Sequence, residues 1–173
     1  MNLELIEPSE RYAASYLAGM AELQAEGRHT GLDLAQVAAE FPRYLAELRL
    51  RADQRRLPPE KVAESVWWAV ADGAWAGRVS FRHELNERLA RFGGHVGYEI
   101  RPSARRRGYG AAALALALER IRPLGYRRVL LTCDEANQAS RRIIERNGGR
   151  LEAIARLPDY PAPICRYWID LAP

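Results

Sequence analysis

The sequence has few residues of the kinds that build metal sites or disulfides. Of its 173 residues only Cys133 and Cys165 are cysteines, and the three histidines are scattered. No Cys-x-x-Cys pair and no Cys/His cluster has the spacing of a zinc site. We therefore expect neither a disulfide framework nor a metal site, and a reducing cytoplasm is the expected compartment.

Long apolar runs are also missing. The longest strongly apolar run, 111–118, is far shorter than the roughly 20 residues that a membrane-spanning helix needs. Glu4 and Glu7 lie within the first apolar stretch and no basic segment precedes it, so neither a membrane partner nor a secretory signal is expected. With 48% hydrophobic and 28% charged residues, the composition is that of a soluble globular protein, and the length predicts one domain over residues 1–173.

Lysine is nearly absent, because Lys61 is the only one, so arginine supplies almost all the positive charge of a chain with net charge +4. This is either a compositional bias of the genome or a sign of an anionic ligand, since guanidinium groups present a planar fork to phosphates. Nucleic acid is not an expected partner. Acidic and basic residues alternate, as in Glu119-Arg120 and Glu145-Arg146, and no nucleic-acid-binding motif is present.

The periodicity of apolar residues predicts a mixed α/β (α+β) fold with one central sheet of about six to seven strands flanked by helices. We expect strands at 3–6, 65–71, 75–82, 95–101, 129–133, 150–155 and 164–171. We expect helices at 10–26, at 84–91, at 109–121, at 138–146, and in two stretches between 33 and 56 that Pro42 breaks or kinks. Asp72-Gly73 is the turn signal of a hairpin.

An arginine-rich loop lies between a predicted strand and the longest apolar helix. It reads Arg105-Arg106-Arg107-Gly108-Tyr109-Gly110-Ala111. Glycines at alternate positions allow a tight turn and a close approach of the backbone to a ligand. The first N–H groups of the helix have no partner within the helix, and the helix dipole adds positive charge there. The segment is therefore predicted to bind an anion, phosphate above all.

Three kinds of phosphate loop have to be distinguished. A Walker loop needs Gly-Lys-Ser/Thr, which is missing here. Residues 108–113 match the G-x-G-x-x-A dinucleotide fingerprint, but 102–107 separate them from the strand, where that motif follows its strand directly. Arg105-x-x-Gly108-x-Gly110 matches the R/Q-x-x-G-x-G/A signature of the GNAT superfamily of acyl-CoA-dependent N-acyltransferases, and we identify the chain as resembling that family.

The resemblance extends to the element order and to Asn137-x-x-Ser140 followed by an Asn-Gly-Gly turn. It implies a GNAT-like fold with acetyl-CoA as co-substrate. The pantetheine arm would lie between the splayed strands on either side of the helix, at the backbone of Ile100. The N–H groups of residues 105–111 would hold the pyrophosphate, with Arg106 or Arg107 facing the 3′-phosphate or solvent. Asn137 and Ser140 would contact the pantetheine or phosphate end, although Asn137 also reads as a helix N-cap.

The catalytic residues follow less directly from the resemblance. Family bases often lie toward the start of the strand before the loop, where Glu99 and His95 are the candidates. Alternation places Val96, Tyr98 and Ile100 on one face of that strand and both candidates on the other. The alternative is that Glu99 is an ordinary solvated strand residue. His83 and Glu84 are the fallback candidates.

The general acid departs from the family pattern. Many members have a tyrosine four positions beyond Ser140, where this chain has Ile144. Release of the thiolate would then depend on water, on Tyr109 or Tyr160, or on no acid. Cys133 lies in an apolar strand and reads as a core residue rather than a nucleophile.

The predicted function is N-acetylation of a primary amine, of a small molecule by default, by direct attack on acetyl-CoA. A non-catalytic acyl-CoA-binding or regulatory module and a protein N-acetyltransferase are the alternatives. Many relatives pair through strands near the C-terminal end, so a homodimer is also implied by the resemblance.

Overall fold

The structure is a computed structural model that describes residues 2–171 and holds six α-helices and seven strands in that range. The strands are β1 Leu3–Ile6, β2 Glu64–Ala71, β3 Ala74–Arg82, β4 Val96–Ile100, β5 Arg128–Asp134, β6 Arg150–Ala155 and β7 Ile164–Asp170. The helices are α1 Ala13–Ala25, α2 Leu34–Ala39, α3 Phe41–Leu50, α4 Glu87–Arg91, α5 Tyr109–Ile121 and α6 Gln138–Arg146. None of these helices is long and apolar enough to cross a bilayer.

Local sequence signals explain where the helices begin. A 3₁₀ turn, Glu10–Tyr12, precedes α1, and Ser9 caps it. Asp33 caps α2 by accepting hydrogen bonds from two N–H groups of its first turn. Pro42 separates α2 from α3 as predicted, and it lies in the first turn of α3, where a missing N–H costs nothing. The fourth helix begins at Glu87 rather than at residue 84, because Asn86 caps it.

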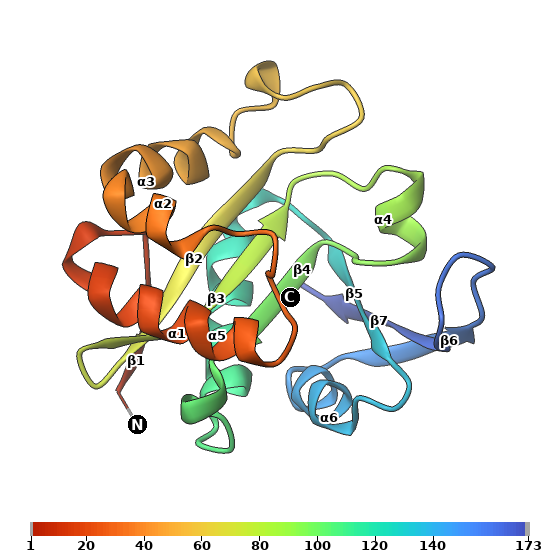
Figure 1. Cartoon of the computed structure of the whole chain (residues 1–173). Helices are drawn as coiled ribbons and strands as arrows, with labels where there is room; N and C mark the ends of the chain where they lie inside the picture. Colours follow the sequence, from red (N-terminus) through yellow and green to blue (C-terminus); the bar gives the residue numbers. More distant parts are fainter. Residues whose placement is uncertain (1, 172–173) are drawn as a thin grey trace.

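The seven strands and their flanking helices confirm the predicted fold class, but the strands are hydrogen-bonded as two sheets rather than one. A four-stranded sheet has the order β1-β2-β3-β4 and a three-stranded sheet the order β5-β7-β6. All neighbouring pairs are antiparallel. The two sheets meet at β4 and β5, which diverge downward in Figure 1. We call the space between them the β4–β5 gap.

The junction of the sheets lies just before β4. The N–H of His95 donates to the carbonyl of Leu130 on β5 at 2.7 Å, and its carbonyl accepts from Arg82 on β3 at 2.7 Å. Gly94 has φ +64°, and a Cβ there would lie 2.4 Å from the carbonyl oxygen of Leu130. Only glycine allows so close an approach. The two strands therefore touch at this end and separate toward their C-terminal ends.

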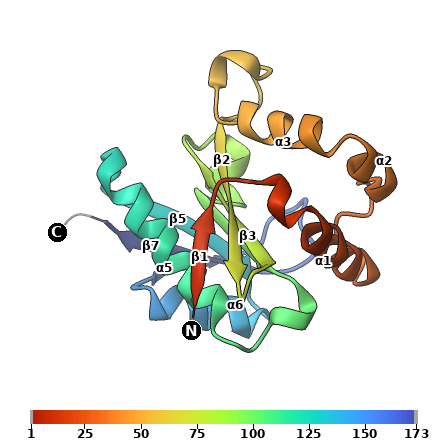
Figure 2. The same cartoon turned by 90° about the vertical axis from the view of Figure 1, so that its left-hand side faces the viewer.

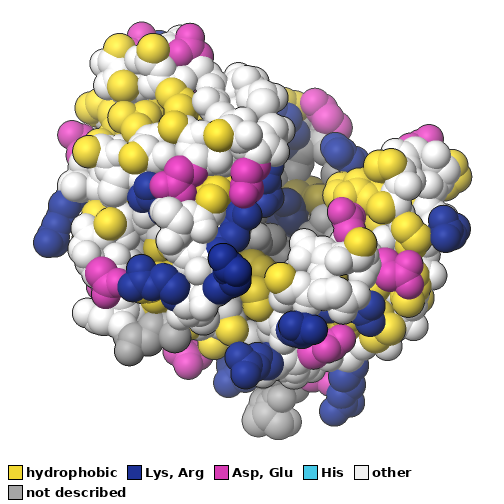
Figure 3. Space-filling model, turned by 60° about the horizontal axis from the view of Figure 1, so that its bottom comes forward, with side chains coloured by type: hydrophobic (Ala, Val, Ile, Leu, Met, Phe, Trp, Pro, Cys, Tyr) yellow, Lys and Arg dark blue, Asp and Glu magenta, His cyan; other side chains and the backbone are white. Residues whose placement is uncertain are grey.

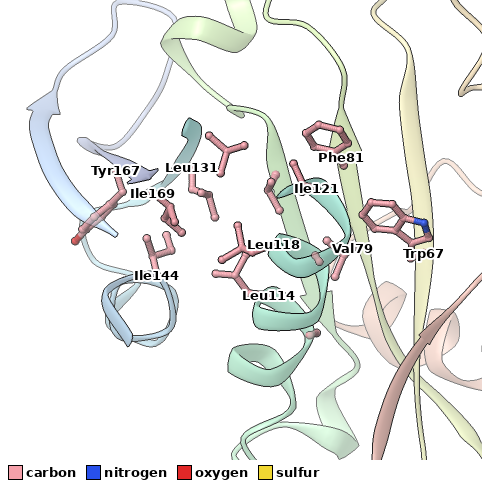
Figure 4. Packing of buried hydrophobic residues seen from close by; sticks show 14 of the residues in the cluster. Trp67, Val79, Phe81, Leu114, Leu118, Ile121, Leu131, Ile144, Tyr167 and Ile169 are labelled. Atoms are coloured by element: carbon pink, nitrogen blue, oxygen red, sulfur yellow. The ribbon is translucent and has the colours of Figure 1, made fainter. Parts of the chain in front are cut away.

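The helices cover both faces of the four-stranded sheet. Figure 2 shows α1, α2 and α3 on one side of β1, β2 and β3, and α5 on the other. The first side holds an aromatic core in which Tyr16 stacks on Trp68. On the second side Leu114, Leu118 and Ile121 of α5 fill the space between the two sheets (Figure 4). Helix α5 therefore packs on both sheets, and its N-terminus lies near the end of β4.

Candidate functional site

The loop before α5 has the backbone conformation of an anion-binding nest. Arg106 has φ +60° and Gly108 has φ +79°, so two residues of this short loop adopt the left-handed conformation. The N–H of Arg105, which was expected to bind the pyrophosphate, donates to the carbonyl of Pro102 at 3.2 Å, but within the described range no group accepts a hydrogen bond from the main-chain N–H groups of residues 106–111. Successive free N–H groups at the start of a helix attract an anion. Gly110 lets α5 approach α6, because a Cβ there would lie 2.8 Å from Ile143.

Two of the three loop arginines are tied to acids on other elements. Arg105 forms a two-pronged ion pair with Glu26 at 2.8 and 2.6 Å, and Arg107 pairs with Asp72 at 2.8 Å. Arg106 has no ion pair among residues 2–171 and its side chain is exposed. Arg106 is therefore the loop arginine whose guanidinium is free for a ligand, while the other two fix the loop.

A second clamp holds the same loop on α1. Glu22 accepts hydrogen bonds from Arg101, and from the N–H and hydroxyl of Ser103 at 2.9 Å each. The Arg101 guanidinium lowers the pKa of Glu22 to about 2. With Glu26 and Arg105, this clamp fixes the C-terminal half of α1 against the anion-binding loop. It thereby sets the position of the loop that follows α1.

The β4–β5 gap is bridged by a tyrosine that the sequence analysis did not select. The hydroxyl of Tyr98 on β4 lies 2.8 Å from Oγ of Ser140 on α6. Burial raises the pKa of Tyr98 above its usual value. Asn137 caps α6 by accepting from the N–H of Ser140 at 3.0 Å, as its alternative reading predicted. Ile100 ends β4, and its carbonyl accepts from Nε of Arg105 at 3.1 Å.

Glu99 is buried, so its reading as a solvated strand residue is wrong. Its side chain is 4% exposed. Oε2 lies 2.7 Å from Nε2 of His29 and 3.3 Å from Nε of Arg78. Oε1 lies 2.6 Å from Nη2 of Arg28, a close ion pair without the alignment of a hydrogen bond. The cause is the loop between α1 and α2, which places Arg28 and His29 over β4.

No sequence signal pointed to His29, which lies 70 residues from Glu99. Its φ of +52° is rare for a residue with a side chain. The amide of Gln24 holds the loop by donating to the carbonyls of His29 at 3.0 Å and Leu32 at 2.6 Å. Strained backbone that the surroundings hold in place is typical of functional sites. The sequence did not reveal the positive φ of His29, because glycine is the residue that usually marks such a conformation.

The remaining base candidates have other contacts. Nδ1 of His95 accepts from the N–H of Leu130 at 2.9 Å, so the ring helps join the sheets. Burial lowers the pKa of His95, which favours the neutral ring that this bond needs. His83 pairs with the hydroxyl of Ser65 at 2.8 Å. Glu84 is exposed.

The residues considered for the general acid have other surroundings, whereas Tyr98, which was not among them, contacts Ser140 on α6. Ile144 is fully buried in the core. The hydroxyl of Tyr109 donates to Asp72 at 2.9 Å, and that of Tyr160 to Asp134 at 2.7 Å. Cys133 is buried and free, and burial raises its pKa to about 11, which confirms its reading as a core residue.

Two hollows lie beyond the start of β4. One of about 880 Å³ is bordered by α4 and by the β6–β7 loop at Tyr160. One of about 500 Å³ reaches Arg82 and Gly93. Arg82 shares a face of β3 with Arg78, so the second hollow borders the same sheet face as the Glu99 cluster. Figure 3 views the molecule from below and shows Lys and Arg side chains around a hollow between two lobes.

Comparisons with known proteins agree with this geometry. A family model described as an acetyltransferase (GNAT) domain matches residues 7–150. The microcin C7 self-immunity acetyltransferase MccE, solved with acetyl-CoA and AMP, is similar at a TM-score of 0.70 and 13% identity, over 97% of this chain and 92% of that chain. No curated protein matches the sequence.

Two further solved structures have similar folds. RimJ of Mycobacterium smegmatis, in complex with CoA-disulfide, gives a TM-score of 0.72 at 20% identity, over 97% of this chain and 81% of that chain. The acetyl transferase of Salmonella typhimurium that modifies the N-terminal serine of ribosomal protein L7/L12 gives 0.69 at 18% identity, over 98% of this chain and 95% of that chain. At such identities the likeness shows the fold.

Proposed function

Because the chain belongs to the GNAT family of acetyl-CoA-dependent acetyltransferases, we propose that it acetylates the primary amine of a small molecule by direct attack on the thioester. The observation that carries this proposal is the contact of His29 with Glu99. It places a histidine over β4, the strand that leads to the anion-binding loop. Acetyl-CoA is the co-substrate.

The free N–H groups of residues 106–111 would hold the pyrophosphate. They fit an anion because they carry no internal partner and lie at the positive end of α5. The side chain of Arg106 is free to meet a further phosphate. Asn137 and Ser140 lie at the start of α6, on the other side of the gap from Ile100.

His29 would accept the proton that the amine loses on attack. Glu99 accepts the hydrogen on Nε2, which leaves Nδ1 as the ring nitrogen with a free lone pair. Glu99 then orients the ring, as a carboxylate does in other histidine-based proton acceptors. In this assignment Glu99 is a positioning residue rather than the base itself.

Tyr98 would donate a proton to the sulfur as the C–S bond breaks. The new C–N bond takes the electron pair of the amine, and the pair of the C–S bond goes to sulfur. The hydroxyl contacts Ser140 at the start of α6, and its raised pKa keeps it protonated at neutral pH. Tyr98 thus supplies from β4 the acid that Ile144 cannot supply from α6. A base and an acid argue against a non-catalytic module.

A protein N-terminus is the second candidate acceptor. The hollow that reaches Arg82 and Gly93 favours it, because it borders the sheet face that holds Glu99. The Salmonella acetyl transferase named above modifies the N-terminal serine of a protein. MccE, in contrast, is a microcin C7 self-immunity acetyltransferase.

The experiment that tests the function is calorimetric titration with acetyl-CoA, using NAD as the control ligand. We expect saturable binding of acetyl-CoA and no binding of NAD. Release of free thiol is then followed with a panel of small amines and peptides. Binding of NAD in place of acetyl-CoA would reject the assignment of the loop, and binding without turnover of any amine would favour the non-catalytic module.

A further inference from the structure

The sheet face that carries Glu99 also carries a row of polar residues on β3. Arg78, Ser80 and Arg82 alternate along the strand and therefore point to the same side. Arg78 pairs with Glu99 on β4, and Ser80 pairs with Gly97. We call Arg78, Ser80 and Arg82 the β3 row. Its members follow each other at about 7 Å, the spacing of two residues in a strand.

Positive charge is in excess along this row, because the nearby acids Glu99 and Glu64 face more than one arginine each or are already paired: Glu64, the β2 partner of Arg82, pairs with Arg51 at 3.4 Å. Glu99 faces both Arg28 and Arg78, so one carboxylate contacts two guanidinium groups. It contacts the ring of His29 in addition. Arg82 is half-buried and forms no ion pair with any acid in residues 2–171. Its Nη1 donates instead to the carbonyls of Gly93 and Gly94 at 3.0 Å each. The site would repel a purely cationic acceptor and attract an anion.

The donors for that anion gather around Ser80. Gly97, the cross-strand partner of Ser80, has no side chain, and a Cβ there would lie 3.3 Å from Oγ of Ser80 and 3.8 Å from both Nη atoms of Arg82. The hydroxyl of Ser80 makes no hydrogen bond within the described part of the chain. A free hydroxyl between two guanidinium groups, beside a missing side chain, has the donors that a carboxylate or phosphate needs.

We propose that the acceptor amine carries a carboxylate or phosphate close to its amino group, and that this anion binds over Ser80 between Arg78 and Arg82. This inference rests on the proposed function, since it takes the amine to lie at His29. The remainder of the acceptor would extend into the hollow that borders Arg82. An amino-acid-like small molecule and a peptide with an acidic residue near its N-terminus offer the same chemistry.

The test compares acceptors that differ only in the negative charge. The small-molecule arm uses γ-aminobutyrate and its carboxamide, and phosphoethanolamine against ethanolamine. The peptide arm uses Ser-Glu-Ala-Gly-amide against Ser-Gln-Ala-Gly-amide. The measured quantity is the ratio of kcat/KM between the members of a pair. In one arm or the other, the wild-type protein should prefer the anionic member by about tenfold or more, a difference that one charge-assisted contact supplies.

Two variants at one position separate charge from shape. Ser80→Asp places a carboxylate between Arg78 and Arg82, where it pairs with both, and should reduce the preference about tenfold or more. Ser80→Asn introduces a side chain of the same shape without the charge. The kcat/KM values of the two members of a pair should therefore change by the same factor. Because the ratio of each variant is divided by the ratio of wild type, differences in amine basicity between the two acceptors cancel.

The outcomes distinguish a failure of the anion site from a failure of the proposed acetyltransferase function. If the wild-type protein acetylates the neutral members as well as the anionic ones, the anion site is wrong and the acetyltransferase assignment stands. If Ser80→Asp keeps the anionic preference in full, the site is also wrong. If acetyl-CoA binds but no member of any pair is acetylated, the proposed function fails and the anion site falls with it.

Discussion

Nε2 of His29 lies 2.7 Å from the carboxylate of Glu99, and this pair joins the loop after α1 to the strand before the anion-binding loop. Arg28 and Arg78 complete the ring of groups around the carboxylate. The Glu22–Arg101 and Glu26–Arg105 clamps hold the same two segments together. The protein thus places a proton acceptor and a phosphate cradle in a fixed relation to each other.

Replacement of His29 tests the proton acceptor. His29→Ala should lower kcat by about 10²–10⁴-fold, the usual contribution of a general base, with little change in the KM for acetyl-CoA. Added imidazole should restore part of the rate. Glu99→Gln should cause a smaller loss that imidazole does not restore, because the ring is still present but no longer oriented.

His83→Ala is the matched control for this pair. His83 contacts Ser65 rather than the Glu99 cluster, so its loss should leave the rate of acetyl transfer within about twofold of wild type. If His83→Ala and His29→Ala were equally slow, or if imidazole failed to rescue His29→Ala, the assignment of His29 as proton acceptor would be wrong.

Replacement of Tyr98 tests the proton donor. Tyr98→Phe should lower kcat about tenfold to a hundredfold, because a thiolate leaves readily even without an acid. Tyr160→Phe, which removes the hydroxyl that contacts Asp134, should lose less. The raised pKa of Tyr98 means that its hydroxyl stays protonated beyond about pH 10, the usual tyrosine value. Any loss of rate on the alkaline side below that pH should therefore persist in Tyr98→Phe, because Tyr98 is not the group that ionises there. The pH–rate profiles of both variants check this.

A single glycine tests the phosphate cradle. Gly108→Asp puts a carboxylate where the loop N–H groups point and should weaken acetyl-CoA binding at least about a hundredfold, as measured by calorimetry. Gly125→Asp is the control, because Gly125 also has a left-handed φ, +87°, but follows the other end of α5. Both changes impose a similar backbone cost of about 1–3 kcal/mol. Equal affinity of the two folded variants would contradict the cradle.

The clamp on α1 makes stability depend on pH. The pKa of Glu22 is lowered from 4.5 to about 2, so ionised Glu22 stabilises the fold above the unfolded-state pKa, and this contribution is lost as pH falls through the range from 4.5 to about 2. Glu22→Gln should lower the free energy of unfolding by about 1–2 kcal/mol at neutral pH.

Urea unfolding at several pH values measures this difference. The gap between wild type and Glu22→Gln should shrink as the solution becomes acidic. Glu40→Gln is the control, because Glu40 pairs with Arg43 on an exposed surface, and it should change stability by less than about 0.5 kcal/mol. A gap that persists at low pH would mean that the carboxylate charge of Glu22 is not what stabilises the clamp.

The sequence indicated the anion-binding loop because its physics is local. Gly108 reaches a left-handed φ without cost, and the N–H groups at the start of α5 lack partners in any helix. The Asn137 cap and the turn at Asp72-Gly73 are local in the same sense. Arg106 shows the limit of such reasoning, since its own positive φ and its free side chain became visible only in the structure.

The order of strands and helices, the hairpin turn and the free N–H groups before α5 were predictable from local sequence, because each depends on residues within one turn or one strand. The tertiary structure decided the burial of Glu99, the partnership of His29 with it, the reach of Tyr98 to Ser140 and the split into two sheets. These depend on which distant segments meet, and the free energy of such contacts comes from burial and charge pairing that a linear pattern does not encode.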